Sequence, residues 1–333
     1  RIIRVYDHEV QGGTVVKPLL GASDDGASDA CVLRPRGVKG WRGAALGCGI
    51  NPNIGKVDAY AMAVSVVDEA VRNVVAVGAD PERIVLLDNF CWGDPRKTER
   101  LGALVRAAQG CHEAALHHMA PFISGKDSLN NEYRDSLGES HSIPDTLLIS
   151  ALGIVPDVRR CVTMDLKQAG NIVYLLGETR AEFGGSHYLL VSGQECEHAD
   201  PPALAENSHA LNRALHLAMR DGLVRACHDL SEGGLAVAAA EMCIAGRLGM
   251  RVDSNLIHPS TQVALFSESN GRYIVTVEAV RAGRFESKMR GFDCVRIGEV
   301  TRETVLDLGG HLCASVDELC AVWKHGAETD GCV

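Results

Sequence analysis

The sequence contains few of the features that mark membrane, secreted or nucleic-acid-binding proteins. Its longest apolar runs, such as 147–155, fall far short of the roughly 20 residues that cross a bilayer, and no signal peptide is visible. Acidic residues outnumber basic ones by 43 to 33, so we expect no general basic face for nucleic acid or anionic lipid. The first residue is Arg rather than Met, and we expect the chain to be part of a longer gene product.

Paired cysteine spacings are also missing, although twelve cysteines are present. No two of them form a CxxC pair, which argues against a zinc site or a disulfide scaffold. Several lie in apolar stretches, where a reduced cysteine packs as a small hydrophobic residue. We therefore expect reduced thiols and a cytoplasmic protein.

What the sequence does contain is an alternation of helical and extended patterns over 333 residues, enough for two domains. Apolar residues at three- and four-residue steps predict helices over 56–77 and 97–119. Strands of the first part are predicted at 14–16, 30–33, 84–87, 121–124 and 146–155. The stretch 156–171 changes character, so we place the boundary there, between domains 1–158 and 159–333.

The second domain repeats the alternation, and the fold class is therefore α/β (α+β). Its helices are predicted over 204–222, 233–245 and 316–324. Its strands are predicted at 172–176, 224–227, 263–267, 273–277, 295–300 and 305–308.

Polar residues gather where predicted strands end, the usual place for ligand-binding groups in such folds. Asp88 follows the strand 84–87, while Gly125, Lys126 and Ser128 follow the strand 121–124. Glycine lets a backbone approach a ligand and lysine attracts phosphate, but the spacing is not that of a P-loop. From the residues alone, a cap or a turn explains both clusters as well as a site does.

A second set of polar residues suggests a hard cation. Glu69 and Asn73 lie one turn apart on a helix that is apolar nearly all round, and their oxygens suit Mg²⁺. In the segment 228–234, Asp229 can reach a metal, and two glycines would leave helix N–H groups open to an anion. Helix capping by Ser231 is the alternative there, and a simple turn is favoured for Asp29.

Four runs of sequence together resemble one known family. They are VDEAVRNVVAVGADP (67–81), PFISGKDSLNNEY (121–133), LGETRAEFGGS (176–186) and HDLSEGG (228–234). In this order, over nearly the whole chain, they resemble the phosphoribosylformylglycinamidine synthases of purine synthesis, and specifically the C-terminal half of their synthetase part. The resemblance implies an aminoimidazole ribonucleotide synthetase-like unit. In that unit an N-terminal sheet domain contributes strands to a shared barrel, and a C-terminal α/β domain follows.

The resemblance also implies an ATP-dependent C–N ligase in which ATP phosphorylates the formamide oxygen of formylglycinamide ribonucleotide and ammonia displaces the phosphate. By motif match, Asp88, Gly125, Lys126 and Ser128 contact ATP, Mg²⁺ and substrate. A second Mg²⁺–nucleotide, ATP or ADP, is then held by Asp29, Glu69, Asn73, Asp229 and Ser231. The family's catalytic His and glutaminase Cys have no match in this chain, so no catalytic residue is assigned.

The partners implied are the N-terminal synthetase half and a glutaminase domain or subunit. Without them we expect the chain to be inactive and to form a homodimer that mimics the missing half. Two alternatives stay open. One is a complete homodimeric enzyme of the same superfamily, such as aminoimidazole ribonucleotide synthetase or a kinase-like protein. The other is a non-catalytic half that holds a structural nucleotide.

Overall fold

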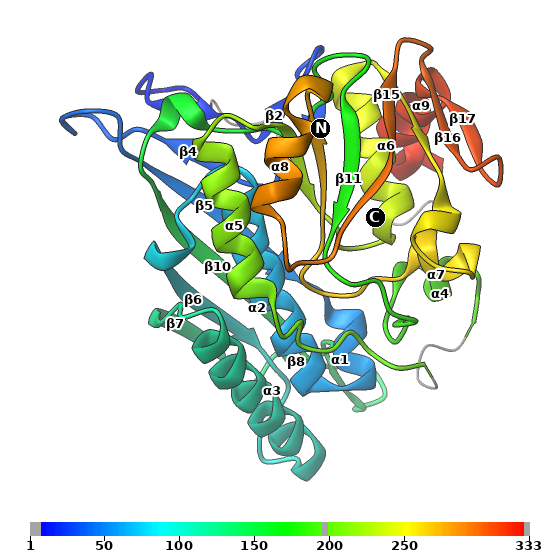
Figure 1. Ribbon diagram of the computed structural model, residues 1–333. Coiled ribbons are helices and arrows are strands. Elements are labelled where there is room, and N and C mark those ends of the chain that lie inside the picture. Colours follow the sequence, from blue (N-terminus) through cyan, green and yellow to red (C-terminus); the bar gives the residue numbers. More distant parts are fainter. Residues whose placement is uncertain (1–7, 195–198, 330–333) are drawn as a thin grey trace.

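The computed structural model describes residues 8–194 and 199–329, which form two mixed sheets and the helices that cover them (Figure 1). The strands of the first sheet lie in the order β1 (Thr14–Val16), β4 (Cys31–Leu33), β5 (Gly43–Ile50), β10 (Thr146–Val155), β6 (Ile84–Cys91) and β7 (Phe122–Ser128). Those of the second lie in the order β12 (Val224–Asp229), β14 (Tyr273–Val277), β11 (Ile172–Leu176), β15 (Cys294–Thr301), β13 (Gly249–Val252), β16 (Val305–Leu308) and β17 (Cys313–Ser315). Two short ribbons pair β2 (Leu19–Leu20) with β3 (Gly26–Ala27) and β8 (Glu132–Arg134) with β9 (Ser140–Ser142).

Helices cover one face of the first sheet and both faces of the second (Figure 1). On the first sheet lie α1 (Pro52–Val57), α2 (Ala59–Ala76) and α3 (Thr98–His117). One face of the second sheet carries α5 (Ser208–Arg220) and α8 (Ala282–Lys288), and the other carries α6 (Gly234–Gly246) and α9 (Val316–Thr329). The short helices α4 (His187–Val191) and α7 (Thr261–Phe266) lie beside them. The described residues contain no helix with the length and apolar character needed to cross a membrane.

Helix α2 runs through the middle of the molecule, packed against β5, β10, α3 and β12. Sixteen of its 18 residues are buried, which explains why apolar residues surround its axis instead of forming one stripe. The single helix predicted over 56–77 is in fact two, because Asp58 adopts an extended conformation and caps α2 through the Tyr60 N–H (2.8 Å).

Strand β5, which the sequence did not predict, lies directly beneath α2. Its sequence, GAALGCGI, is rich in glycine and alanine and has only one of the β-branched residues that mark strands, Ile50 at its end. The glycines instead allow the helix to approach: a Cβ at Gly49 would collide with the Val66 carbonyl oxygen and lie 3.0 Å from the Ala70 nitrogen.

Several predicted boundaries are wrong in a consistent way. Strands β6, β7 and β12 continue through polar residues that were assigned to the loops after them, so Asp88, Lys126 and Asp229 lie inside strands. The strand predicted over 263–267 is the helix α7, whose first turn is capped by the side chain of Ser260. A short apolar run fits both structures, and here the capping residue favours the helix.

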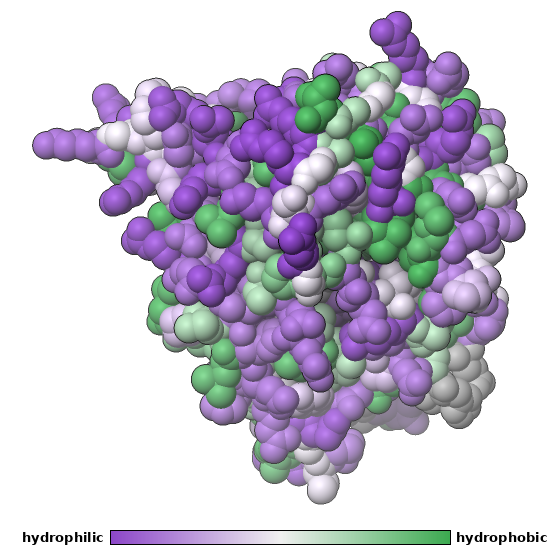
Figure 2. Space-filling model, viewed as in Figure 1, coloured by the Kyte–Doolittle hydropathy of each residue, from purple (hydrophilic) through white to green (hydrophobic). Residues whose placement is uncertain are grey.

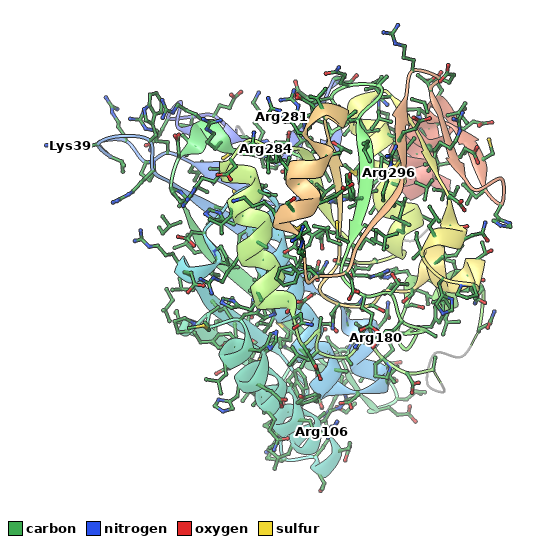
Figure 3. The ribbon with its side chains drawn as sticks, in the orientation of Figure 1. Lys39, Arg106, Arg180, Arg281, Arg284 and Arg296 are labelled. Carbon is green, nitrogen blue, oxygen red and sulfur yellow. The ribbon has the colours of Figure 1, made fainter. Side chains whose placement is uncertain are left out.

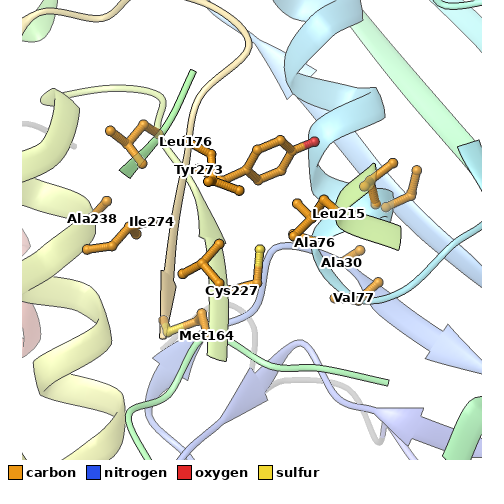
Figure 4. Close-up of a cluster of buried hydrophobic side chains, with 14 of the residues drawn as sticks. Ala30, Ala76, Val77, Met164, Leu176, Leu215, Cys227, Ala238, Tyr273 and Ile274 are labelled. Carbon is orange, nitrogen blue, oxygen red and sulfur yellow. The ribbon is translucent and has the colours of Figure 1, made fainter. Parts of the chain in front are cut away.

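The two parts of the chain share one hydrophobic core. Figure 4 shows Ala76 and Val77 from the first part beside Leu215 from the second, in one cluster with Cys227, Tyr273 and Met164. The outer surface on the face seen in Figure 2 is mostly hydrophilic, with small scattered apolar patches. Segments on either side of residues 156–171 therefore pack as one body around α2.

No helix within residues 8–194 and 199–329 covers the other face of the first sheet. Along β10, Leu147, Ile149 and Ala151 are buried against the helices, whereas the alternate residues are only partly buried. On the neighbouring strand β5, Leu46 and Ile50 face the same open side, and each is 41% exposed. We call this apolar surface the open face of the first sheet.

Candidate functional site

A pocket of about 330 Å³ lies where α2, the end of β12 and the start of α6 meet the β3–β4 loop. Five residues from the sequence prediction line it: Asp29, Glu69, Asn73, Asp229 and Ser231. The structure thus brings together side chains that are up to 202 positions apart, from a loop, a helix and a strand end.

Helix α2 supplies Glu69 and Asn73, and both are oriented by the free edge of β5. Strand β4 pairs with β5 only as far as Leu46, so the rest of that edge has no strand neighbour among the residues that the structure describes. There the Ile50 N–H donates to Glu69 Oε2 (3.0 Å), and Asn73 Nδ2 donates to the Cys48 carbonyl (2.8 Å). These bonds leave Glu69 Oε1 and Asn73 Oδ1 for a ligand.

Asp29 and Asp229 meet on the opposite wall, next to His228. Asp29 Oδ1 bonds His228 Nδ1 (2.8 Å) and accepts the Asp229 N–H (2.9 Å), and Glu241 bonds His228 Nε2 (3.0 Å). Burial alone would lower the pKa of His228, but Asp29 and Glu241 raise it well above its usual value, so the ring is held as a cation. Asp29 Oδ2 is buried and has no hydrogen-bond partner within 8–194 and 199–329.

A buried arginine connects this wall to the helix. The Arg72 side chain is 2% exposed and donates to Asp68 (2.6 Å), Asp229 (2.7 Å), the Leu230 carbonyl (2.7 Å) and Ser231 Oγ (3.3 Å). The sequence suggests Arg72 only as the partner of Asp68 in a surface ion pair, whereas the structure buries both side chains. The signal was present, because Asp68 and Arg72 are an i,i+4 pair of opposite charge on a helix with no polar face.

The carboxylates of the pocket repel one another. Burial, Glu232 and Asp229 raise the pKa of Glu69 well above its usual value, and burial raises that of Asp229 to about 6 despite Arg72. Asp68 behaves differently: burial would raise its pKa, but Arg72 and His118 bring it below its usual range. Asp29 Oδ2 is an orphan acceptor, and the other donors are carboxylate and amide oxygens, so the residues fit a hard divalent cation such as Mg²⁺.

The N–H groups of the two glycines at the start of α6 are already paired, which contradicts the prediction that these glycines leave N–H groups open to an anion. The Gly233 N–H donates to Glu268 Oε1 (2.8 Å), and the Gly234 N–H donates to the Ser231 carbonyl (3.0 Å). The capping interpretation of Ser231 is wrong as well, because its hydroxyl donates to Asp229 instead. Glu268 also accepts the His187 N–H (2.9 Å), and burial raises its pKa to about 7.

The side chains of the other predicted group point to opposite faces of the first sheet. This group is Asp88, Gly125, Lys126 and Ser128. In the parallel pair of β6 and β7, Asp88 lies opposite Gly125, and Asn89 lies opposite Lys126. Successive side chains alternate between faces, so Asp88 points toward the helix-covered face, while Lys126 and Ser128 point toward the open face. The Asp88 carboxylate packs so closely on Gly125 that a Cβ there would collide with it.

This division keeps the second group out of a common pocket. The Lys126 ammonium donates to Ser128 Oγ on the open face, and burial together with Asp127 raises the pKa of Asp88 on the other. None of the residues Asp88, Gly125, Lys126 and Ser128 lines the 330 Å³ pocket. The structure therefore brings Asp29 together with its predicted partners in one pocket, whereas it places Asp88 on the opposite face of the sheet from Lys126 and Ser128.

A further cluster with metal-type side chains has a structural explanation. Asp135, Glu139 and His141 lie close together on the β8–β9 ribbon. Asp135 Oδ1 accepts the N–H groups of Leu137 and Glu139 (2.9 Å each), and Oδ2 bonds His141 (2.8 Å). The carboxylate thus shapes the turn of the ribbon.

Comparison with family models matches both parts of the chain. Residues 27–155 match the N-terminal domain, and residues 168–310 the C-terminal domain, of AIR synthase related proteins. The first match ends and the second begins within or next to the segment 156–171.

Curated relatives are phosphoribosylformylglycinamidine synthase subunits PurL. That of Alkaliphilus metalliredigens is 34% identical over 97% of this chain and 42% of its own length. The Deinococcus radiodurans subunit is 35% identical over 97% of this chain and 43% of its own length. The chain thus spans about two fifths of the length of the curated relatives it matches.

Solved structures share the fold at lower identity. Thermotoga maritima PurL complexed with FGAR superposes with a TM-score of 0.72 at 19% identity, covering 91% of this chain and 49% of that one. The same protein complexed with ADP gives 0.67 at 21% identity, covering 88% and 46%. A chain of the HypE–HypF complex gives 0.61 at 14% identity and is itself covered to 92%.

Proposed function

Because the chain belongs to the AIR synthase related family, we propose that it is a nucleotide-binding part of the ATP-dependent ligase that makes formylglycinamidine ribonucleotide. The reaction joins ammonia to formylglycinamide ribonucleotide and converts ATP to ADP and phosphate. The names of the curated relatives support this activity. The observation that carries the proposal for this chain is the pocket of Asp29, Glu69, Asn73 and Asp229, with the orphan oxygen of Asp29 buried beside it.

In this proposal the pocket holds Mg²⁺ together with ATP or ADP. Asp29, Glu69, Asn73 and Asp229 supply oxygen ligands, and Ser231 supplies a hydroxyl at the mouth. Mg²⁺ supplies charge neutralisation for the nucleotide phosphates. The chain's own residues set the geometry: β5 fixes Glu69 and Asn73, and Arg72 fixes Asp229 and Ser231.

We further propose that the reaction site needs a second AIR synthase-like unit. Lys126 and Ser128 are exposed or half-buried on the open face, and Asp88 lies behind them on the other face. A unit seated on the open face would complete a site around Lys126 and Ser128 and would bury the apolar residues there. In the full enzyme this unit is the N-terminal synthetase half, a glutaminase supplies ammonia, and the assembly acts in the cytoplasm.

Calorimetric titration of the chain with Mg²⁺–ATP and Mg²⁺–ADP tests the pocket assignment. We expect saturable binding that Asp29→Asn weakens by about tenfold or more, because a buried ligand charge is removed. Glu69→Gln provides a second variant in case the first fails to fold. The matched control is Glu303→Gln, an exposed acid outside the pocket, which should bind like the native chain.

Two results would count against the assignment. One is a native chain that does not bind nucleotide in the presence of Mg²⁺. The other is unchanged binding by both pocket variants. Lys126→Ala separates the two groups of residues, because it should leave binding at this pocket unchanged.

A second candidate function is a complete enzyme built from a single such unit. Two solved chains of this fold are covered to 89% and 92% by the present chain, so one unit of this size occurs as a whole protein. ATP turnover by the chain alone would favour this candidate. Nucleotide binding without ATP turnover would favour the first candidate, in which the chain is part of a larger ligase.

A further inference from the structure

Residues 34–42, between β4 and β5, form a cationic arm at the margin of the first sheet. The sequence Arg34-Pro-Arg-Gly-Val-Lys-Gly-Trp-Arg42 contains four basic residues and no acid. The whole chain has a net charge of −10, so the arm carries +4 and the remainder carries −14. Figure 3 shows Lys39 at the tip of the arm, extending away from the body.

The base of the arm is held in one conformation. Two guanidinium groups lie over the Trp41 ring, with the carbon of Arg34 5.0 Å and that of Arg159 4.6 Å from the ring centre. Backbone bonds anchor both ends: the Val158 N–H donates to the Trp41 carbonyl (2.8 Å), and the Arg34 N–H donates to the Gly13 carbonyl (2.7 Å). The arm therefore presents its charges without a large ordering cost on binding.

The charges beyond this base have no partner in the part of the chain that the structure describes. Arg36, Lys39 and Arg42 are exposed, and none of them makes an ion pair within residues 8–194 and 199–329. Arg159, in contrast, pairs with Asp157 at 2.7 Å. Like charges that are held together and unpaired attract an acidic surface.

The arm is continuous with the open face. Leu33, the last residue before the arm, is 39% exposed and pairs with Ala44, so it shares its face with Leu46. A body that covers Leu33 and Leu46 would therefore come within reach of the arm. The apolar character of this face and the acidity of the chain favour a protein of similar charge over a nucleic acid.

We propose that the cationic arm binds an acidic surface of a second copy of this chain when that copy covers the open face. This inference rests on the proposed pairing through the open face. The arm would set the orientation of the two copies relative to each other. Apolar contacts alone specify weakly how one copy slides or rotates on the other, whereas a charge contact away from the centre of the interface fixes both.

Sedimentation equilibrium of the full chain at several salt concentrations tests the inference. We expect a dimer whose dissociation constant rises with salt, and Arg36→Glu/Lys39→Glu should raise that constant by about tenfold or more at low salt. Above about 0.5 M salt the difference between native and variant should shrink, because exposed charges are screened. The control Arg290→Glu/Arg302→Glu makes the same change in net charge at two exposed residues outside the arm and should leave the constant nearly unchanged.

The outcomes distinguish a failure of the arm contact from a failure of the pairing through the open face. A native dimer that the arm variant leaves unchanged overturns the inference but not the pairing, and Leu46→Glu should then still dissociate it. A chain that stays monomeric at high concentration overturns the inference, because no second copy then covers the open face, whereas the proposed pairing with the N-terminal half does not depend on this result. Equal weakening by the arm variant and the control would mean that only net charge matters, which also overturns the inference.

Discussion

Both the fold and the pocket depend on the hydrogen bonds that the buried guanidinium group of Arg72 donates to Asp68, Asp229, Leu230 and Ser231. Replacing Arg72 with methionine keeps much of the volume and removes the charge. Asp68 would then retain the Gly271 N–H (2.9 Å) at Oδ2 and His118 Nε2 (3.3 Å) beside Oδ1, and Asp229 would retain the Ser231 hydroxyl beside Asp29. The Asp68 side chain is fully buried and that of Asp229 is 8% exposed, so neither can recover its lost partner from water.

Breaking one side of a buried ion pair generally costs about 3–5 kcal/mol, and we expect Arg72→Met to lower the free energy of unfolding by that amount. Urea unfolding followed by circular dichroism at pH 7 measures it. The double variant Arg72→Met/Asp68→Asn should lose less than the two single variants summed, because it removes both charges of one pair.

The matched control is Arg106→Met. The side chain of Arg106 is 53% exposed and pairs with Asp58 across the surface, so its loss should cost about 0.2–1 kcal/mol. A loss below about 1 kcal/mol for Arg72→Met would refute the reasoning, because it would mean that the buried carboxylates find other compensation. Full additivity in the double variant would equally contradict the coupling between Arg72 and Asp68.

Three further variants test packing and titration. Gly49→Ala should destabilise the chain by about 1–3 kcal/mol, because the new Cβ would collide with the Val66 carbonyl. The control Gly102→Ala, whose Cβ would have nothing within 4 Å, should stabilise α3 by up to about 1 kcal/mol. Thermal unfolding of the two variants and the native chain measures both changes. Glu268 has a pKa of about 7 against 4.5 unfolded, so the native state holds more protons in that window and stability falls as pH rises through it. Glu268→Gln should remove this decline in unfolding midpoints between pH 4.5 and 7, and an unchanged slope would assign it to another group.

Strand and helix assignments from sequence succeed where one periodicity applies over a long segment. The predicted strands 146–155 and 172–176 match β10 and β11, and the helix over 97–119 matches α3. In β10 the burial alternates strictly, and in β11 every residue is buried, so each pattern is unambiguous. Strand β5 has neither signal, because its composition is set by the close approach of α2.

The prediction of site residues from the sequence has the same limit. Spacing alone suggested Glu69 and Asn73 as neighbours, but it gives no reason to join them to Asp29 and Asp229, which meet only through the fold. Gathering these residues required the family resemblance. The Asp88 group illustrates the converse: residues adjacent in two neighbouring strands point to opposite faces, and this was hidden because polar residues of an exposed edge strand were interpreted as a loop.

Helix α2 makes the fold and the pocket inseparable. It carries two i,i+4 pairs offset by one residue, so they form adjacent stripes about 100° apart. One stripe, Asp68 and Arg72, binds the loop after β12 and the Gly271 N–H. The other, Glu69 and Asn73, binds the edge of β5. The pocket lies between these attachments, so any rotation of the helix that relieved one stripe would break the other and displace two of the four oxygen donors. The buried charges of this helix therefore fix the geometry of the pocket before any ligand enters.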